Sequence, residues 1–142
     1  MALLIDGYNL LHVTGIFGQR GASGGKGGLQ RSREALIRFL AASIAPKELS
    51  RTTVVFDAAD APVGLPQCIH YDSMTILYAS EYPDADTLIE EMIEQVSDPR
   101  SLLVVSSDHR IQRAARRRRA RFTDSDTWYA QLWRERQARK QT

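Results

Sequence analysis

The sequence predicts an α/β protein, a three-layer α/β/α sandwich built around a mainly parallel sheet. Short apolar runs rich in β-branched residues alternate with longer segments whose apolar residues recur at helical spacing. This alternation is typical of helices packed on both faces of a parallel sheet. The chain has 142 residues, 43% of them hydrophobic and 25% charged, which is enough to bury one core without disulfides. We therefore expect a single domain over residues 1–142.

The first half of the chain is expected to supply two strands and one helix. The apolar run 2–5 and the β-branched run 52–56 each predict a buried strand. Between them, residues 15–28 hold seven glycines, which predicts a flexible loop. Residues 29–45 carry leucine and isoleucine at helical spacing ahead of Pro46, so a helix is expected to end there.

The second half continues the alternation. Short apolar runs predict extended segments at 68–71, 73–80, 101–106 and around Arg121 and Phe122. Helices are expected from Asp84 or Asp86 to Val96, from near Asp108, and from Asp124 or Ser125 to about Arg139. The carboxyl ends of parallel strands then meet at one edge of the sheet, where ligands bind in open sheets of this kind.

The composition argues against a membrane or secreted protein. No stretch approaches the roughly 18 consecutive apolar residues of a membrane span, and Asp6 interrupts the first apolar run too early for a signal peptide. The single cysteine, Cys68, cannot form an internal disulfide or build a zinc site alone. We expect a cytoplasmic protein with no membrane partner.

Charge is distributed unevenly behind a net value of +2. Residues 1–109 hold 8 Lys and Arg against 14 Asp and Glu, whereas residues 110–142 hold 11 against 3. Seven arginines and no acid lie in residues 110–121, and residues 134–142 form a basic C-terminal end. A basic segment on an acidic chain predicts a polyanionic partner. A solvated charged surface is the plainer alternative.

Aspartates follow the predicted strands. Directly after a strand or shortly beyond it come Asp6, Asp57, Asp84, Asp86, Asp108 and Asp124. A single aspartate of this kind is explained as a helix cap, but several at one edge repel one another and raise each other's pKa. No lysine or arginine stands at a strand end to compensate them, and carboxylate oxygens suit Mg²⁺ or Mn²⁺. We therefore predict a divalent metal site at this edge.

Four motifs lie at these strand ends: IDGYN at 5–9, VVFDA at 54–58, DADTLIE at 84–90 and VVSSD at 104–108. Together they resemble the NYN branch of the PIN-like nuclease superfamily, and within it the small YacP-like proteins. The resemblance extends from Leu3 to about Leu132. It implies a metal-dependent endoribonuclease that uses one or two Mg²⁺ or Mn²⁺ ions and leaves 5′-phosphate and 3′-hydroxyl ends.

The resemblance also implies site residues. The catalytic set is Asp6, Asn9, Asp86 and Asp108, with Asp6, Asp86 and Asp108 as metal ligands and Asp57, Asp84 and Asp124 as second-rank candidates. Two positions depart from the family pattern. Thr87 stands where close relatives often have a second acid, and Arg110 stands where other branches carry another aspartate. These departures leave the number of metals and the retention of activity open.

The residues between these acids carry further expectations. Gly7 should permit a close approach of the backbone to metal or phosphate, and Asn9 should orient Asp6 or a phosphate oxygen. Tyr8 and Leu10 are expected to pack in the core, with base stacking as a second role for Tyr8. A metal-free route through the ribose 2′-hydroxyl would need paired histidines, and the chain's three histidines form no recognisable pair.

Two basic regions are candidates for RNA binding. At 100° per residue, one helix face is predicted to carry Arg110, Arg113, Arg116 and Arg117 opposite an apolar face. Such a face can hold phosphates without reading sequence. In the glycine-rich loop, Arg20 and Lys26 are candidates for a flexible clamp, or the loop is a plain connector. The partner implied by the resemblance is single-stranded RNA, including RNA presented by a ribosome, and the oligomeric state stays open.

Other functions are weaker alternatives. A non-catalytic RNA-binding relative would explain the missing second acids, but it has no reason to crowd carboxylates near a polyanion. An aspartate-nucleophile phosphatase wants a second acid two residues after Asp6, where Tyr8 stands. A phosphate-binding loop is excluded because Gly27 follows Lys26 where Ser or Thr is required.

Overall fold

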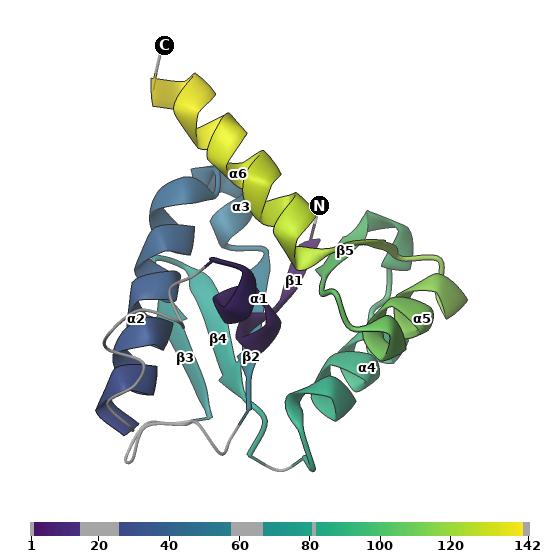
Figure 1. The fold of residues 1–142 in the computed structure, drawn as a ribbon. Helices are drawn as coiled ribbons and strands as arrows, with labels where there is room; N and C mark the ends of the chain where they lie inside the picture. Colours follow the sequence, from purple (N-terminus) through teal and green to yellow (C-terminus); the bar gives the residue numbers. More distant parts are fainter. Residues whose placement is uncertain (1, 15–25, 58–66, 81, 141–142) are drawn as a thin grey trace.

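The computed structural model describes residues 2–14, 26–57, 67–80 and 82–140. Within these residues, six strands form one sheet in the order β3-β4-β2-β1-β5-β6. Helices cover both faces of the sheet (Figure 1). The predicted fold class is therefore confirmed: a single α/β domain with a mainly parallel sheet flanked by helices.

The strands are short and mostly apolar. They are β1 (Ala2–Asp6), β2 (Thr52–Phe56), β3 (Cys68–Tyr71), β4 (Met74–Tyr78), β5 (Leu102–Val105) and β6 (Arg121–Thr123). Neighbouring strands pair in parallel except for β3, which is antiparallel to β4. The two residues that connect them, Asp72 and Ser73, both have positive φ, 48° and 71°. Tight two-residue hairpins favour this backbone conformation.

One face of the sheet is covered by α1 (Gly7–Thr14), α2 (Lys26–Ser43) and α6 (Ser125–Lys140), with the short α3 (Pro46–Leu49) after α2. Because side chains alternate along a strand, every second residue points to this face. The buried core here includes Ile5, Val54, Phe56, Leu36, Leu40 and Trp128.

The other face is covered by α4 (Ala85–Gln95) and α5 (His109–Arg117), and a single 3-10 turn, η3 (Pro99–Ser101), precedes β5. The intervening strand residues point to this side and join the helices in a second buried core that includes Leu4, Val55, Val104, Ile89, Ile93 and Ile111. Figure 1 shows α4 and α5 side by side, separated from α2 by the sheet. None of the helices in the described residues is long and apolar enough to cross a membrane.

Three element boundaries differ from the sequence prediction. Helix α1 starts at Gly7, immediately after β1, where no helix was expected. Helix α2 begins at Lys26, so residues 26–28 belong to the helix and not to the glycine-rich loop. Pro46 ends the preceding helix as expected, but it also opens α3 as its first residue, a position at which proline's missing N–H costs nothing.

The connections between elements place a crevice beside β1. After β1 the chain turns to helices on one face, and after β5 it turns to α5 on the other face. The two strands are neighbours in the sheet. In open α/β sheets such a switch point opens a crevice at the carboxyl ends of the strands. The predicted acidic residues lie at this edge.

Candidate functional site

A cavity of about 180 Å³ lies at the carboxyl edge of the sheet. It is lined by Asp6, Tyr8, Asn9, Asp57, Asp84, Ala85, Asp86 and Asp108. The fold therefore brings together all four residues predicted to be catalytic and two of the three second-rank acids. Asp124 does not line this cavity, and its carboxylate accepts a hydrogen bond from Gln112 Nε2 at 2.8 Å instead.

Asp6 is the buried centre of the cavity. It ends β1 and is only 6% exposed. Its Oδ2 accepts a hydrogen bond from Ser106 Oγ at 2.9 Å, and its Oδ1 accepts one from the Asn9 backbone N–H at 3.3 Å. Both bonds favour the charged form, yet burial raises the pKa of Asp6 to about 6, with Asp108 and Asp57 contributing. A buried carboxylate without a cation explains this direction.

Asp86 and Asp108 come from the starts of two neighbouring helices. Asp86 lies in the first turn of α4, and Asp108 caps α5 by accepting from the Arg110 backbone N–H at 2.8 Å. Burial raises the pKa of Asp86 to about 7, and the charges of Asp108 and Asp6 raise it further. The three carboxyls therefore interact electrostatically although they lie far apart in the sequence.

Asp57 and Asp84 have structural partners in the same cavity. Asp57 Oδ1 accepts from the Ala85 backbone N–H at 2.7 Å. Asp84 caps α4 by accepting from the backbone N–H and the hydroxyl of Thr87, at 2.8 and 2.6 Å. These hydrogen bonds from Thr87 lower the pKa of Asp84. Both carboxylates thus hold the start of α4 in place, which positions Asp86.

Asn9 is fixed by serines from two other elements. Its side-chain oxygen accepts from Ser125 Oγ at 2.6 Å and from the Ser107 backbone N–H at 2.9 Å. Ser107 Oγ in turn accepts from the Ser125 backbone N–H at 3.0 Å. With its oxygen engaged, Asn9 has its amide N–H₂ left as the donor that it can offer to a ligand in the cavity.

Ser107 and Ser125 are site residues that the sequence prediction missed. Ser125 is fully buried and begins α6, directly after the Asp124 that was considered as a metal ligand. Ser107 lies inside the VVSSD motif. Both serines follow a strand, as the predicted aspartates do. A search of the strand ends could therefore have found them if it had included hydroxyl residues as well as acids. Ser106, recognised as part of the motif, donates to Asp6.

Arg110, predicted to bind RNA, is paired with acidic side chains. Its guanidinium pairs with Glu90 at 2.5 Å and lies 3.6 Å from Asp84. It also donates to Thr87 Oγ1 at 3.2 Å. The hydrogen bond to Glu90 raises the pKa of Arg110. Arg110 and Thr87, the two departures from the family pattern, are therefore in contact with each other and join α5 to α4.

The other predicted RNA-binding residues are placed less fully. Arg113, Arg116 and Arg117 are exposed on α5, and Ile111 and Ala115 are buried on its opposite face, as the helical spacing predicted. The guanidinium of Arg116 also lies 5.4 Å from the centre of the Phe122 ring. Arg20 lies outside the described residues, and Lys26 is described only as the first residue of α2.

Gly7 and Tyr8 differ from their expected roles. A Cβ on Gly7 would lie 2.5 Å from the Phe56 ring, so glycine is needed for packing between α1 and β2. Tyr8 is not a core residue: it is 37% exposed, and its ring makes an edge contact with His12 at 4.7 Å. Tyr8 therefore presents an aromatic ring where it lines the cavity. Leu10 is fully buried, as predicted.

The cavity fits a hard divalent cation by the chemistry of its donors. Its charged ligands are carboxylates, and no lysine or arginine of the described residues lines it beside the buried Asp6. Across the same described ranges, no three acidic, histidine or cysteine side chains stand close enough together to hold a metal. Mg²⁺, however, often binds through one or two carboxylates and keeps several waters, so a closed three-residue cage is not required.

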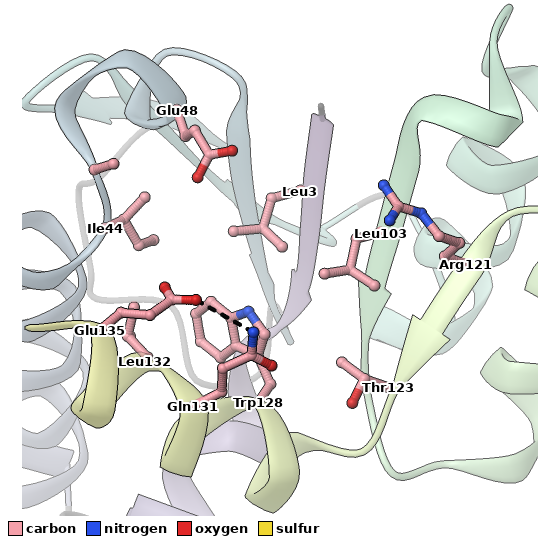
Figure 2. Close-up of a pocket in the computed structure, with 11 residues that line it drawn as sticks. Leu3, Ile44, Glu48, Leu103, Arg121, Thr123, Trp128, Gln131, Leu132 and Glu135 are labelled. Carbon is pink, nitrogen blue, oxygen red and sulfur yellow. Dashed lines mark hydrogen bonds between the residues drawn. The ribbon is translucent and has the colours of Figure 1, made fainter.

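A larger cavity, of about 290 Å³, lies elsewhere and contains none of the predicted site residues. Figure 2 shows it beside β1 and β5, with Glu48 on one side and the α6 residues Trp128, Gln131 and Glu135 on the other. Gln131 Nε2 donates to Glu135 Oε1 at 3.2 Å. Size alone therefore does not select the candidate site, which is chosen for the chemistry of the smaller acidic cavity.

Solved structures and family comparisons agree with this description. The chain is similar to Rae1 (YacP) from Bacillus subtilis, with 20% identity, a TM-score of 0.71, and coverage of 99% of this chain and 78% of that one. The W164L mutant of the same protein matches with 20% identity, a TM-score of 0.70, and coverage of 99% and 80%. At this identity the likeness shows the fold alone. No curated protein sequence matches this chain.

The family itself is shown by sequence. The family described as "YacP-like NYN domain" matches residues 3–142, which is nearly the whole chain. The match includes all four strand-end motifs. NYN domains typically depend on a metal, and membership of the family indicates a nuclease with an RNA substrate. This chain belongs to the YacP-like NYN domain family.

Proposed function

We propose that this protein is a metal-dependent endoribonuclease that hydrolyses RNA phosphodiester bonds at the acidic cavity. The observation that carries the proposal is the meeting of Asp6, Asp86 and Asp108 at one sheet edge. Burial raises the pKa values of Asp6 and Asp86, and neighbouring carboxylates raise them further. Crowded carboxylates destabilise the metal-free protein, and a bound cation would offset their repulsion.

Asp6, Asp86 and Asp108 are the residues that would hold one or two Mg²⁺ or Mn²⁺ ions. When bound, such an ion supplies Lewis acidity and charge neutralisation for the attack of water on a phosphodiester. Ser106 holds Asp6 by donating to it. Asp57 and Asp84 fix the start of α4 and so set the position of Asp86.

The remaining residues of the cavity would bind and orient the RNA. The Asn9 amide, held by Ser125 and Ser107, can donate to a phosphate oxygen without adding charge. Tyr8 offers an exposed ring on which an unpaired base can stack. Single-stranded RNA suits such a site best because its bases are free to splay out.

The exposed arginines of α5 would hold the RNA backbone beyond the cavity. Arg113 and Arg117 lie about 8 and 14 Å from Asp108 along the helix, at a rise of 1.5 Å per residue. RNA presented by a ribosome in the cytoplasm is one form that the substrate could take, and the single cysteine, Cys68, fits that compartment.

A non-catalytic RNA-binding module is the second candidate. It is favoured by one observation, that no three potential ligands in the described residues are in place for a metal. The loss of a second acid at Thr87 points the same way. The buried carboxylate of Asp6 argues against this candidate. A module that only binds RNA has no reason to keep a negative charge at the surface that contacts a polyanion.

Cleavage of an end-labelled single-stranded RNA tests the proposal. Wild type, Asp108→Asn and Asp124→Asn proteins are compared with Mn²⁺, Mg²⁺ or EDTA. Asp124 is the matched control because it also follows a strand but lies outside the cavity. We expect metal-dependent cleavage with 5′-phosphate ends by wild type and Asp124→Asn, and a loss of at least about 100-fold in Asp108→Asn.

Three other results would contradict the proposal. Salt-sensitive RNA binding without cleavage by any of the three proteins would favour the binding module. Products with 2′,3′-cyclic phosphates would show a metal-free reaction through the ribose hydroxyl. Equal cleavage by wild type and Asp108→Asn would remove this cavity from the reaction.

A further inference from the structure

A second groove, of about 260 Å³, lies between α2 and the β3–β4 hairpin. Ile37, Ile69, Tyr71 and Tyr78 give it an apolar lining, and Tyr71 is 39% exposed. Three charged side chains of α2, Arg33, Glu34 and Arg38, also line it. None of these residues belongs to the acidic cavity.

Arg33 is the unusual residue of this groove. It is only 3% exposed, and within the described part of the chain its Nε and Nη1 atoms have no hydrogen-bond partner. Its guanidinium carbon lies 5.9 Å from the centre of the Tyr78 ring. Buried charged donors without acceptors are costly, so their presence here indicates a missing acceptor.

One end of the groove lies on β4, which is separated by β2 from the strand that carries Asp6. Tyr78 ends β4 at the carboxyl edge, and its ring stacks on Phe56 with 5.9 Å between ring centres. Phe56 in turn packs against Gly7, the residue after Asp6. From Tyr78 the groove runs along the hairpin to Tyr71, which pairs with Met74, a distance of about 13 Å for four strand residues.

We propose that this groove binds one unpaired base of the RNA, next to the phosphodiester at the acidic cavity. This inference rests on the proposed ribonuclease function and adds a base-specific subsite to it. The tyrosine and isoleucine side chains cover the faces of the base. Arg33 N–H groups donate to acceptors on its edge, and the guanidinium turns toward the groove as the base enters.

The lining of the groove selects among ligands. Because it is mostly apolar, it favours a flat, uncharged base over a phosphate group, whose hydration would be lost in the groove. Guanine fits best, since its O6 and N7 atoms accept hydrogen bonds from arginine and its N1–H and N2–H₂ groups can donate to a carboxylate. Adenine presents an amino group where guanine has O6, and that group meets the Arg33 donors unfavourably.

Binding of labelled hexauridylates that carry one central guanine, adenine or abasic site tests this inference. Fluorescence anisotropy in EDTA prevents cleavage and compares wild type, Arg33→Met and Arg31→Met. Arg31 is an exposed arginine of the same helix that does not line the groove. We expect wild type and Arg31→Met to bind the guanine oligomer about tenfold more tightly than the abasic one. In Arg33→Met the ratio should fall below about twofold.

The experiment includes controls for the folding of the variants and for failure of the nuclease proposal. Met replaces a buried unpaired charge with an apolar chain of similar length, so Arg33→Met should melt no lower than wild type. If Arg33→Met does not fold, Tyr71→Ala is tested instead, because Tyr71 is exposed and also lines the groove. This variant should also lower the ratio between the affinities for the guanine and the abasic oligomer. An unchanged ratio in Arg33→Met, or equal binding of guanine and abasic oligomers by wild type, overturns the inference. Cleavage with Mn²⁺, assayed separately, shows whether the nuclease proposal stands or fails independently.

Discussion

At the scale of single residues, one of the two hydrogen bonds that orient Asn9 comes from a buried hydroxyl. Ser125 Oγ donates to the Asn9 side-chain oxygen at 2.6 Å, across 116 positions of sequence. If that bond is removed, only the Ser107 backbone N–H holds the oxygen. The amide can then turn over more readily and present an oxygen where the proposed function needs a donor. Under the proposed function, Ser125 is a positioning residue, which acts on the substrate only through Asn9.

We expect Ser125→Ala to lower kcat about tenfold, the effect of removing one hydrogen bond of about 1.4 kcal/mol, with little change in melting temperature. The double mutant Asn9→Ala, Ser125→Ala should be no slower than Asn9→Ala alone, because the two act as one unit. Single-turnover cleavage rates of the four proteins measure this. Additive losses would show that Ser125 acts independently of Asn9.

Asp6 gives the metal-free protein a pH-dependent stability. Its pKa is about 6 in the folded chain against an ordinary value of 3.8, so the folded state binds the proton more tightly. Stability from this group is therefore greatest below pH 4 and falls as the pH rises through 6. The loss amounts to about 3 kcal/mol at neutral pH.

Asp6→Asn carries no titrating charge and should remove the part of the fall that Asp6 causes, whereas a part due to Asp86, whose pKa burial raises to about 7, should remain. In EDTA, the melting temperature of the variant should change less between pH 4 and 7 than that of wild type, and it should be higher at pH 7. Differential scanning calorimetry across this range makes the comparison, with Asp124→Asn retaining the wild-type profile. A parallel decline in wild type and Asp6→Asn would show that Asp6 does not contribute to the fall.

At the scale of elements, the junction between β1 and α1 depends on Gly7. A Cβ there would lie 2.5 Å from the Phe56 ring, which packs in the core. We expect Gly7→Ala to destabilise the fold by about 1–3 kcal/mol through overpacking and to reduce cleavage because α1 carries Asn9. Phe56→Leu in the same chain should recover part of the stability. Urea unfolding of the single and double variants tests this, and additive losses would contradict it.

The sequence could predict elements whose signal is local. The strands follow from apolar runs, and the gathering of Asp6, Asp86 and Asp108 follows from the rule that parallel strands end at one edge. Helix α1 was missed because eight residues are too few for a clear helical period. The roles of Gly7 and Ser125 depend on contacts with residues far away in the chain, and no local pattern records them.

Arg110 illustrates the same limit in a charged residue. Helical spacing correctly placed it near Arg113 and Arg117, at the boundary of the exposed face. It could not reveal that Glu90 of α4 faces Arg110 and binds its guanidinium. The pairing depends on how α4 and α5 pack, which is a property of the second core.

At the scale of the whole molecule, acidic and basic groups are separated around the sheet edge. Carboxylates line the cavity, whereas exposed arginines extend from it along α5. A polyanion can therefore be held by the helix while only one of its phosphates meets the acids. Under the proposed function, this division of charge would let a net positive segment and an acidic site act on the same substrate.

The salt dependence of RNA binding tests this division of charge. Replacing both Arg113 and Arg117 with Gln should reduce the slope of log K against log salt concentration, by about 0.7 for each phosphate of a single strand that is no longer neutralised. Arg100→Gln is the matched control, because Arg100 is exposed in η3 at the other end of β5, and it should keep the wild-type slope. Asp108→Asn should also keep it, since the cavity carboxylates release no counterions from RNA. Anisotropy titrations between 50 and 300 mM KCl in EDTA, roughly the range in which such effects are resolved, measure all four slopes. A slope that falls equally in Arg100→Gln would mean that RNA binds across the whole basic surface and that α5 does not guide it to the cavity.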